Sequence, residues 1–132
     1  MLKIVKVAQK YAESFAQALD LVAKERKYLG TVTGFPLESI KDFIHTAEVN
    51  DFAQYFALDG GKVIGWCDII PKNQEGFTHV GNLGIGLLAE YRHKGIGSVL
   101  LQKALEHAKE RNNLEKVELE VFESNINAIR LY

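Results

Sequence analysis

The chain has 132 residues, the size of a single domain with one hydrophobic core, and we treat residues 1–132 as one domain. Its 16 basic and 17 acidic residues give a formal net charge of −1, which does not favour binding to nucleic acid or to a membrane surface. Cys67 is the only cysteine, which excludes an intramolecular disulfide and a cysteine-based metal site.

The apolar residues follow helical and alternating patterns that predict a mixed α/β chain. In chain order we expect a strand at 2–8, helices at 11–28 and 37–48 with a loop at 30–36 between them, strands at 52–58, 62–70 and 78–88, a helix at 95–111, a strand at 115–122 and a helix that opens at 125. Asp59-Gly60-Gly61 joins two of these strands and is typical of a tight hairpin turn.

Residues 90–98 form the most informative segment of the chain. A basic triplet precedes Gly95 and Gly97, and a helical pattern begins directly behind them. The first turn of a helix carries backbone N–H groups without intrahelical partners, and it lies at the positive end of the helix dipole. Because glycine has no side chain, a ligand can approach this backbone closely. The pattern predicts a site for a diphosphate.

The diphosphate motif fits neither of two common nucleotide sites. A Walker loop requires Lys-Ser or Lys-Thr after its last glycine, and none follows a glycine here. A dinucleotide motif follows the first strand, whereas Gly95 comes after several predicted strands.

A second segment, residues 119–132, predicts a strand that enters a helix through Ser124 or Asn125 as its N-cap. Together the two segments resemble the GNAT family of N-acetyltransferases, whose coenzyme A loop reads Arg/Gln-x-x-Gly-x-Gly/Ala and whose later motif reads Asn-x-x-Ala-x-x-Leu-Tyr. The matching positions are Arg92, Gly95 and Gly97 in the first motif and Asn125, Ala128, Leu131 and Tyr132 in the second.

The resemblance implies an acyl-coenzyme A N-acyltransferase fold of the α/β (α+β) class, with a mixed, mostly antiparallel sheet and flanking helices. In this family the fourth and fifth strands splay apart, and the pantetheine arm of the coenzyme inserts between them. The family's chain continues beyond the motif tyrosine with a final pair of strands, which this sequence lacks. We therefore expect the 115–122 strand to have an open edge.

The resemblance also implies acetyl-coenzyme A as a co-substrate and no metal. Two glycines within the 83–88 segment indicate a close approach to the strand backbone. We expect contacts with the pantetheine arm from Ile85, Gly86 and Leu87. The other expected coenzyme-binding residues are Arg92, His93, Lys94, Gly95, Ile96, Gly97, Ser98 and Asn125.

Two residues are expected to carry the catalysis by resemblance. Tyr132 is the general acid beside the leaving thiolate, because a phenol of pKa about 10 keeps its proton at neutral pH. Glu120 lies five residues before Asn125, where the ribosomal-protein N-terminal acetyltransferases of this family carry a basic glutamate. Glu120 also fits a solvated strand charge, so three further residues stay open as the base: Glu75, His79 and Asp68.

The implied function is transfer of an acetyl group to a primary amine, on a small molecule or a peptide N-terminus, by direct attack in a ternary complex. The alternatives are a non-catalytic acyl-coenzyme A binding or sensing domain and a phosphate-binding module of unrelated fold. We expect a cytoplasmic protein, because no signal peptide or membrane-length apolar run is present, with a homodimer as a candidate assembly. His45 and His107 lack metal-ligand partners at useful spacing and are expected at the surface.

Overall fold

The computed structural model describes residues 2–24, 36–72, 79–120 and 126–130, the last of these and residues 119–120 by their backbone only. Its six strands form one sheet in the order β1-β2-β3-β4-β5-β6, and only β4 and β5 are parallel neighbours. The elements are β1 (Leu2–Lys6), η1 (Gln9–Tyr11), α1 (Ala12–Ala23), α2 (Leu37–Val49), β2 (Ala53–Asp59), β3 (Lys62–Pro71), β4 (Val80–Leu87), η2 (Ala89–Tyr91), α3 (Ile96–Arg111), β5 (Lys116–Glu120) and β6 (Ile126–Arg130). The predicted mixed, mostly antiparallel sheet with flanking helices is confirmed.

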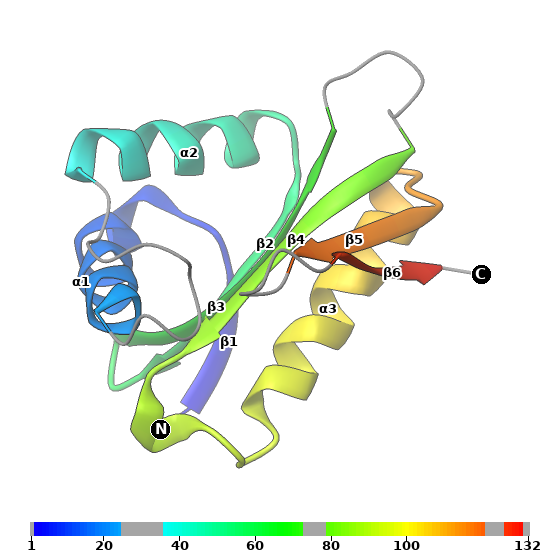
Figure 1. Ribbon diagram of the computed structural model, residues 1–132. Helices are drawn as coiled ribbons and strands as arrows, with labels where there is room; N and C mark the ends of the chain where they lie inside the picture. The colour runs from blue at the N-terminus through cyan, green and yellow to red at the C-terminus, as the bar shows by residue number, and fades with distance from the viewer. Residues whose placement is uncertain (1, 25–35, 73–78, 121–125, 131–132) are drawn as a thin grey trace.

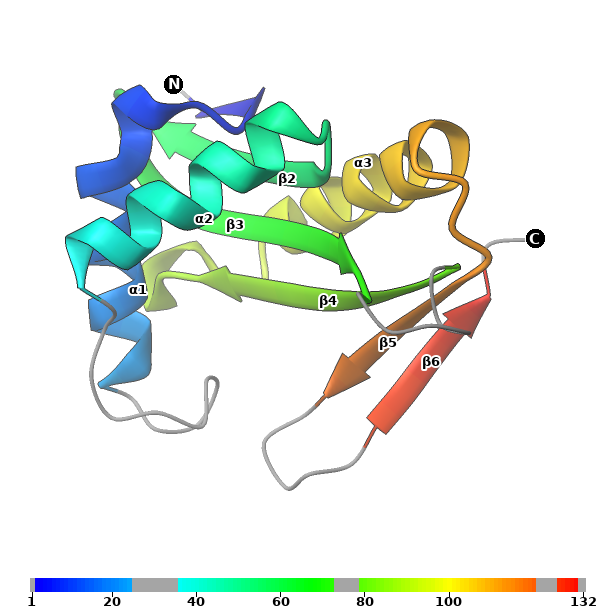
Figure 2. The same ribbon diagram turned by 90° about the horizontal axis from the view of Figure 1, so that it is seen from above.

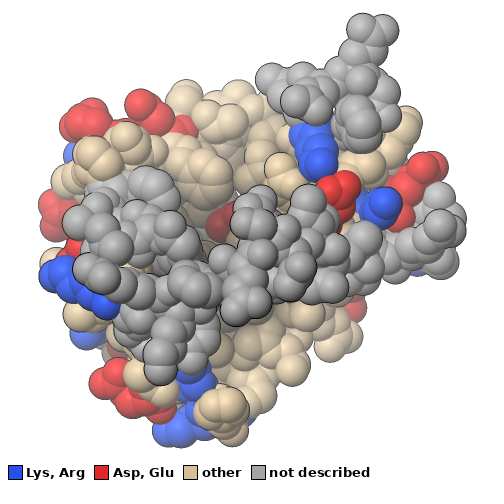
Figure 3. Space-filling view, in the orientation of Figure 1, with Lys and Arg blue, Asp and Glu red and all other residues tan. Residues whose placement is uncertain are grey.

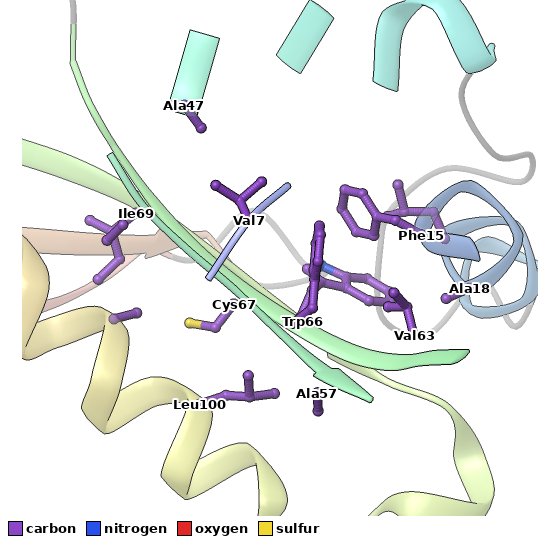
Figure 4. Close-up of a cluster of buried hydrophobic side chains, with 14 of the residues drawn as sticks. Val7, Phe15, Ala18, Ala47, Ala57, Val63, Trp66, Cys67, Ile69 and Leu100 are labelled. Carbon is purple, nitrogen blue, oxygen red and sulfur yellow. The ribbon is translucent and has the colours of Figure 1, made fainter. Parts of the chain in front are cut away.

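The helices cover the two faces of the sheet, with α1 and α2 on one face and α3 on the other (Figures 1 and 2). Alternation along β3 divides its side chains between these faces. Trp66 points toward α1, where its ring centroid lies 5.5 Å from that of Phe15, while Cys67 points toward α3 and Leu100 (Figure 4). We call the face of the sheet that α1 and α2 cover the α1/α2 face. No helix in the described part of the chain is long and apolar enough to span a bilayer.

The β2–β3 hairpin forms as its turn sequence predicts. Gly60 and Gly61 both adopt the left-handed conformation, with φ angles of 60° and 84°. A two-residue turn of this kind matches the right-handed twist of the flanking strands, and glycine adopts it without steric cost. The turn places Asp59 opposite Lys62.

The strands β4 and β5 separate partway along their length. Residues 80–83 of β4 pair with residues 116–119 of β5, whereas the pairing of β4 with β3 continues to Leu87. Figure 2 shows β5 diverging from β4. Gly81 and Leu83 are buried where β5 lies beside them, and residues 84–87 are only half-buried. Among the described residues, β4 therefore has no strand partner on its β5 side beyond Leu83.

The end of the chain corrects two expectations. Residues 126–130 form strand β6 and not the start of a helix, and β6 pairs antiparallel with β5 along 116–120. The edge of β5 is therefore not open. An exposed strand edge is a template for pairing, and the β-branched Ile126 and Ile129 favour an extended backbone.

Candidate functional site

The orientation of the β4 backbone decides which of its groups face the divergence from β5. The Leu88 N–H donates to the Ile64 carbonyl at 2.9 Å, so even-numbered residues of β4 bond to β3. Odd-numbered residues direct their N–H and C=O groups away from β3. Beyond Leu83, these are the groups of Ile85 and Leu87. Their backbone faces the side from which β5 has diverged. An extended ligand that added to the sheet there as a strand would need outward-facing backbone groups of this kind.

The glycines of β4 have a packing role on the α1/α2 face. A Cβ atom at Gly86 would lie 2.4 Å from Cζ2 of Trp66, so cross-strand packing alone requires glycine there. A Cβ atom at Gly84 would lie 3.1 Å from Oδ1 of Asp68. Since the N–H and C=O of Gly86 face β3, Gly86 does not direct backbone groups toward the β5 side as its neighbours Ile85 and Leu87 do.

Side chains at the end of β4 hold the loop that leads to α3. The Tyr91 hydroxyl donates to Oδ2 of Asp59 at 2.6 Å, which raises the pKa of Tyr91 and lowers that of Asp59. The Nε of Arg92 donates to the Leu87 carbonyl at 3.0 Å, so the half-buried guanidinium lies against the end of β4. The Nζ of Lys94 lies 5.9 Å from the centroid of the Tyr91 ring.

The first turn of α3 offers uncapped N–H groups. Gly95 is the N-cap with a φ of 83°, and no side chain caps the helix. The Val99 N–H makes the first intrahelical bond, to the Gly95 carbonyl at 3.3 Å, so the N–H groups of residues 96–98 have no intrahelical acceptor. The first turn of α3 also carries no acidic residue that would repel an anion. The arrangement suits an anion.

Two further features support an anion at this helix start. A Cβ atom at Gly97 would lie 3.4 Å from Cδ1 of Leu87, an ordinary contact, so packing does not require glycine at this position. His93 and Lys94 are exposed beside the turn. Basic side chains gather at the lower edge of the face shown in Figure 3, where the loop between β4 and α3 lies in Figure 1.

One carboxyl group near the β4–β5 divergence has an altered pKa. Asp68 is half-buried on the α1/α2 face of β3, and desolvation of its carboxyl group raises the pKa of that group to about 7. Burial also raises the pKa of the Cys67 thiol on the opposite face, which keeps that thiol protonated and unsuited to act as a nucleophile. Of the predicted alternative bases, Asp68 and His79 lie among the described residues, and it is Asp68 that carries the raised pKa. His79 is exposed before β4.

Several predicted residues cannot be placed in this site. Tyr132, Asn125 and Glu75 lie outside the described residues. Glu120 is the last residue of β5, and its side chain is not described. Their predicted roles stay predictions.

The two histidines on helices differ in their surroundings. His45 is exposed, as expected, but the expectation for His107 is wrong, because His107 is 4% exposed. Its Nδ1 lies 2.8 Å from the Tyr55 hydroxyl and its Nε2 lies 2.7 Å from the Asp51 carbonyl, contacts that join α3 to the start of β2. Within the described ranges, no group of three His, Cys, Asp or Glu side chains could hold a metal ion.

Residues 15–132 match the family model of the acetyltransferase (GNAT) family. An N-alpha-acetyltransferase of Sulfurisphaera tokodaii is 35% identical over 100 residues, which are 68% of this chain and 59% of that relative, so the match spans about three-fifths of the relative's length. A GNAT-family acetyltransferase from Streptococcus pneumoniae superposes with a TM-score of 0.83 at 25% identity, covering 92% of this chain and 75% of that one. The yncA protein of Salmonella typhimurium, solved with its cofactor acetyl-CoA, gives a TM-score of 0.83 at 11% identity, covering 92% and 70%, which shows a shared fold.

Proposed function

The chain belongs to the acetyltransferase (GNAT) family, and from this premise we propose that it transfers an acetyl group from acetyl-coenzyme A to a primary amine. The observation that carries the proposal is the backbone of Ile85 and Leu87, which faces the side of β4 that β5 has left. An extended pantetheine arm can bond there as an added strand would. The Salmonella neighbour was solved with acetyl-CoA, and the Sulfurisphaera relative is named an N-alpha-acetyltransferase, which supports both the coenzyme and the amine.

The diphosphate of the coenzyme would bind at the start of α3. The uncapped N–H groups of Gly97 and Ser98 would donate to phosphate oxygens, and the helix dipole favours the negative charge. Arg92 and Lys94 would add positive charge at the same loop. The bond from Arg92 to the Leu87 carbonyl would hold the guanidinium between the phosphate site and the pantetheine site.

The acyl transfer would proceed by direct attack of the amine on the thioester carbonyl. The attacking amine must be neutral, which at pH 7 costs about 1.4 kcal/mol for an α-amine of pKa about 8 and about 4.6 kcal/mol for a lysine of pKa about 10.4. The smaller cost favours a peptide or amino-acid α-amine as the acceptor. Tyr132, as a proton donor to the thiolate, and Asn125, as a coenzyme contact, complete the proposed site.

A binding and transfer experiment tests this function. The chain is titrated calorimetrically with acetyl-coenzyme A and, as controls, with ATP and NAD. It is then mixed with acetyl-coenzyme A and a panel of amines: peptides with a free α-amine, free amino acids, polyamines and aminoglycosides. We expect selective binding of the coenzyme and thiol release that depends on one class of amine. Coenzyme binding without release by any amine would favour an acyl-coenzyme A sensing domain, and equal binding of ATP would contradict the coenzyme site.

A further inference from the structure

Three neighbouring strands place Gln54, Asp68 and Gly84 in one row across the sheet. Gln54 of β2 pairs with Asp68 of β3, and Asp68 pairs with Gly84 of β4. Directly paired residues have their Cβ positions on the same face and about 5 Å apart. Trp66 lies two residues before Asp68 and contacts Phe15 of α1, so the row lies on the α1/α2 face (Figure 4).

Gln54 is a buried polar side chain that lacks hydrogen-bond partners among the described residues. The residue is 0% exposed, and neither Nε2 nor Oε1 has a hydrogen-bond partner within the described part of the chain. A buried amide without partners destabilises a fold, whereas an apolar side chain of the same shape would not. Its presence beside a carboxyl group is explained if a polar ligand completes its hydrogen bonds.

Asp68 has the position of a proton acceptor for that ligand. No hydrogen bond or ion pair occupies its carboxyl group among the described residues, and the missing side chain of Gly84 leaves space beside Oδ1. Burial is the cause of its raised pKa of about 7, and no neighbouring charge contributes. Among the described side chains, Lys72 and Glu118 lie further along this face and are bonded to each other at 3.0 Å.

The row lies where the acyl end of the coenzyme would arrive. The diphosphate would be held beyond the C-terminal end of β4, so an arm that bonds to Leu87 and then to Ile85 runs back along the strand toward Gly84. Leu83 is the last residue of β4 that pairs with β5, so the space between the two strands ends at Leu83. The thioester at the tip of the arm is thereby directed to the neighbourhood of Gly84 and Asp68.

We propose that Asp68 is the general base of the acetyl transfer and that Gln54 is a positioning residue for the acceptor amine. The inference rests on the proposed function and adds the residues that receive the amine. It assigns the base to β3, on the face of the sheet opposite α3.

The proposed step is balanced in atoms and charge. The acceptor enters as an ammonium group and gives one proton to the Asp68 carboxylate, and its lone pair then forms the C–N bond with the thioester carbon. The C–S bond breaks with its electron pair on sulfur. The thiolate gains one proton from its proposed donor, and the second proton lost by the nitrogen restores that donor. Asp68 afterwards releases its proton to solvent.

The pKa of Asp68 suits this step. An aspartate of ordinary pKa, about 3.9, lies about four pK units below an α-ammonium group of pKa about 8, so it would accept the proton about once in 10⁴ encounters. With a pKa of about 7 the gap is about one unit. The group is then a stronger base and is still half ionised at neutral pH.

The test compares isosteric variants with acetyl-coenzyme A and the amine that releases thiol fastest, for which tetra-alanine and spermidine are the first probes. Asp68→Asn should lower kcat by about 10²- to 10⁴-fold, remove the rise of kcat/KM with pH near 7, and leave the coenzyme Kd within about twofold. Glu118→Gln is the matched control, a carboxylate on the same face, and should change kcat less than about twofold. Gln54→Met should raise KM for the amine more than it lowers kcat. Its urea-unfolding midpoint should equal that of the wild type or lie at a higher urea concentration.

Each result bears on the base assignment. Wild-type kcat and an unchanged pH profile in Asp68→Asn would overturn it, as would loss of the pH-dependent rise in Glu120→Gln instead. If Asp68→Asn does not fold, a carbon-13 NMR titration of the wild-type Asp68 carboxyl replaces it, and a pKa that differs from the kinetic value would overturn the proposal. If the wild type releases no thiol with any amine, the proposed function is overturned together with the base assignment. If the wild type releases thiol but Asp68→Asn behaves as the wild type does, only the base assignment is overturned.

Discussion

Two glycines near the proposed coenzyme site, Gly97 and Gly86, should respond in opposite ways to substitution. Gly97 has a negative-φ helical backbone, and a Cβ atom there would make an ordinary 3.4 Å contact with Leu87. Leucine is also a better helix former than glycine by up to about 1 kcal/mol. We therefore expect Gly97→Leu to keep the free energy of unfolding of the wild type. At Gly86 a Cβ atom would lie 2.4 and 2.7 Å from two atoms of Trp66, so Gly86→Ala should lose about 1–3 kcal/mol through overpacking.

The effects on coenzyme affinity should be the opposite: Gly97→Leu should lower the affinity strongly, and Gly86→Ala should change it little. The leucine side chain would block a phosphate from the N–H groups of the first helical turn, and each charge-assisted hydrogen bond lost costs about 1.5–3 kcal/mol, or about 10- to 150-fold in Kd. Gly86→Ala, measured where the variant is folded, should bind within a few-fold of the wild type. Urea unfolding and calorimetric titration with acetyl-coenzyme A measure both quantities. Wild-type affinity in Gly97→Leu would refute the phosphate site, and unfolding of that variant would refute our account of its packing.

Three other changes test separate parts of the account. Arg92→Ala should weaken coenzyme binding by about 1.5–3 kcal/mol, whereas the exposed Lys103→Ala, one charge removed elsewhere on α3, should change Kd less than about twofold by the same titration. Tyr132→Phe should lower turnover by about 10²- to 10⁴-fold with little change in coenzyme Kd, and wild-type turnover with rate-limiting chemistry would return Tyr132 to a packing role. Because the raised pKa of Asp68 lets the native state keep a proton that the unfolded state loses between pH 3.8 and about 7, stability should fall as pH rises through that window. Asp68→Asn should then match the wild type in urea unfolding at pH 3 and exceed it at pH 8 by no more than about 4 kcal/mol. Equal stability of the two proteins at both pH values would contradict the raised pKa of Asp68.

Features set by neighbouring residues could be predicted from the sequence. The turn at Gly60 and Gly61 follows from local backbone preferences, and the amphipathic start of α3 follows from the glycines and the periodicity behind them. Features set by distant contacts could not. Residues 126–130 pair with β5 because an edge was available, and nothing in the sequence of the segment indicates that edge.

The candidate site shows the same limit. The sequence offered Asp68 as one of several bases, but only the register of β2, β3 and β4 brings it beside Gln54 and Gly84. Gln54 was missed because one polar residue in an apolar strand carries no signal of its own. Gly86 stays a predicted ligand contact, and its packing against Trp66 on the adjacent strand is a second role that the sequence alone did not show.

Amide hydrogen exchange of β4, with and without acetyl-coenzyme A, tests the central claim most directly. The N–H groups of Ile85 and Leu87 face the proposed pantetheine arm, while the N–H of Gly86 between them is already bonded to β3. At a coenzyme concentration about 100 times Kd, exchange at Ile85 and Leu87 should slow by up to about 100-fold, and exchange at Gly86 should change far less. Coenzyme binding that leaves Ile85 and Leu87 unprotected would contradict the account.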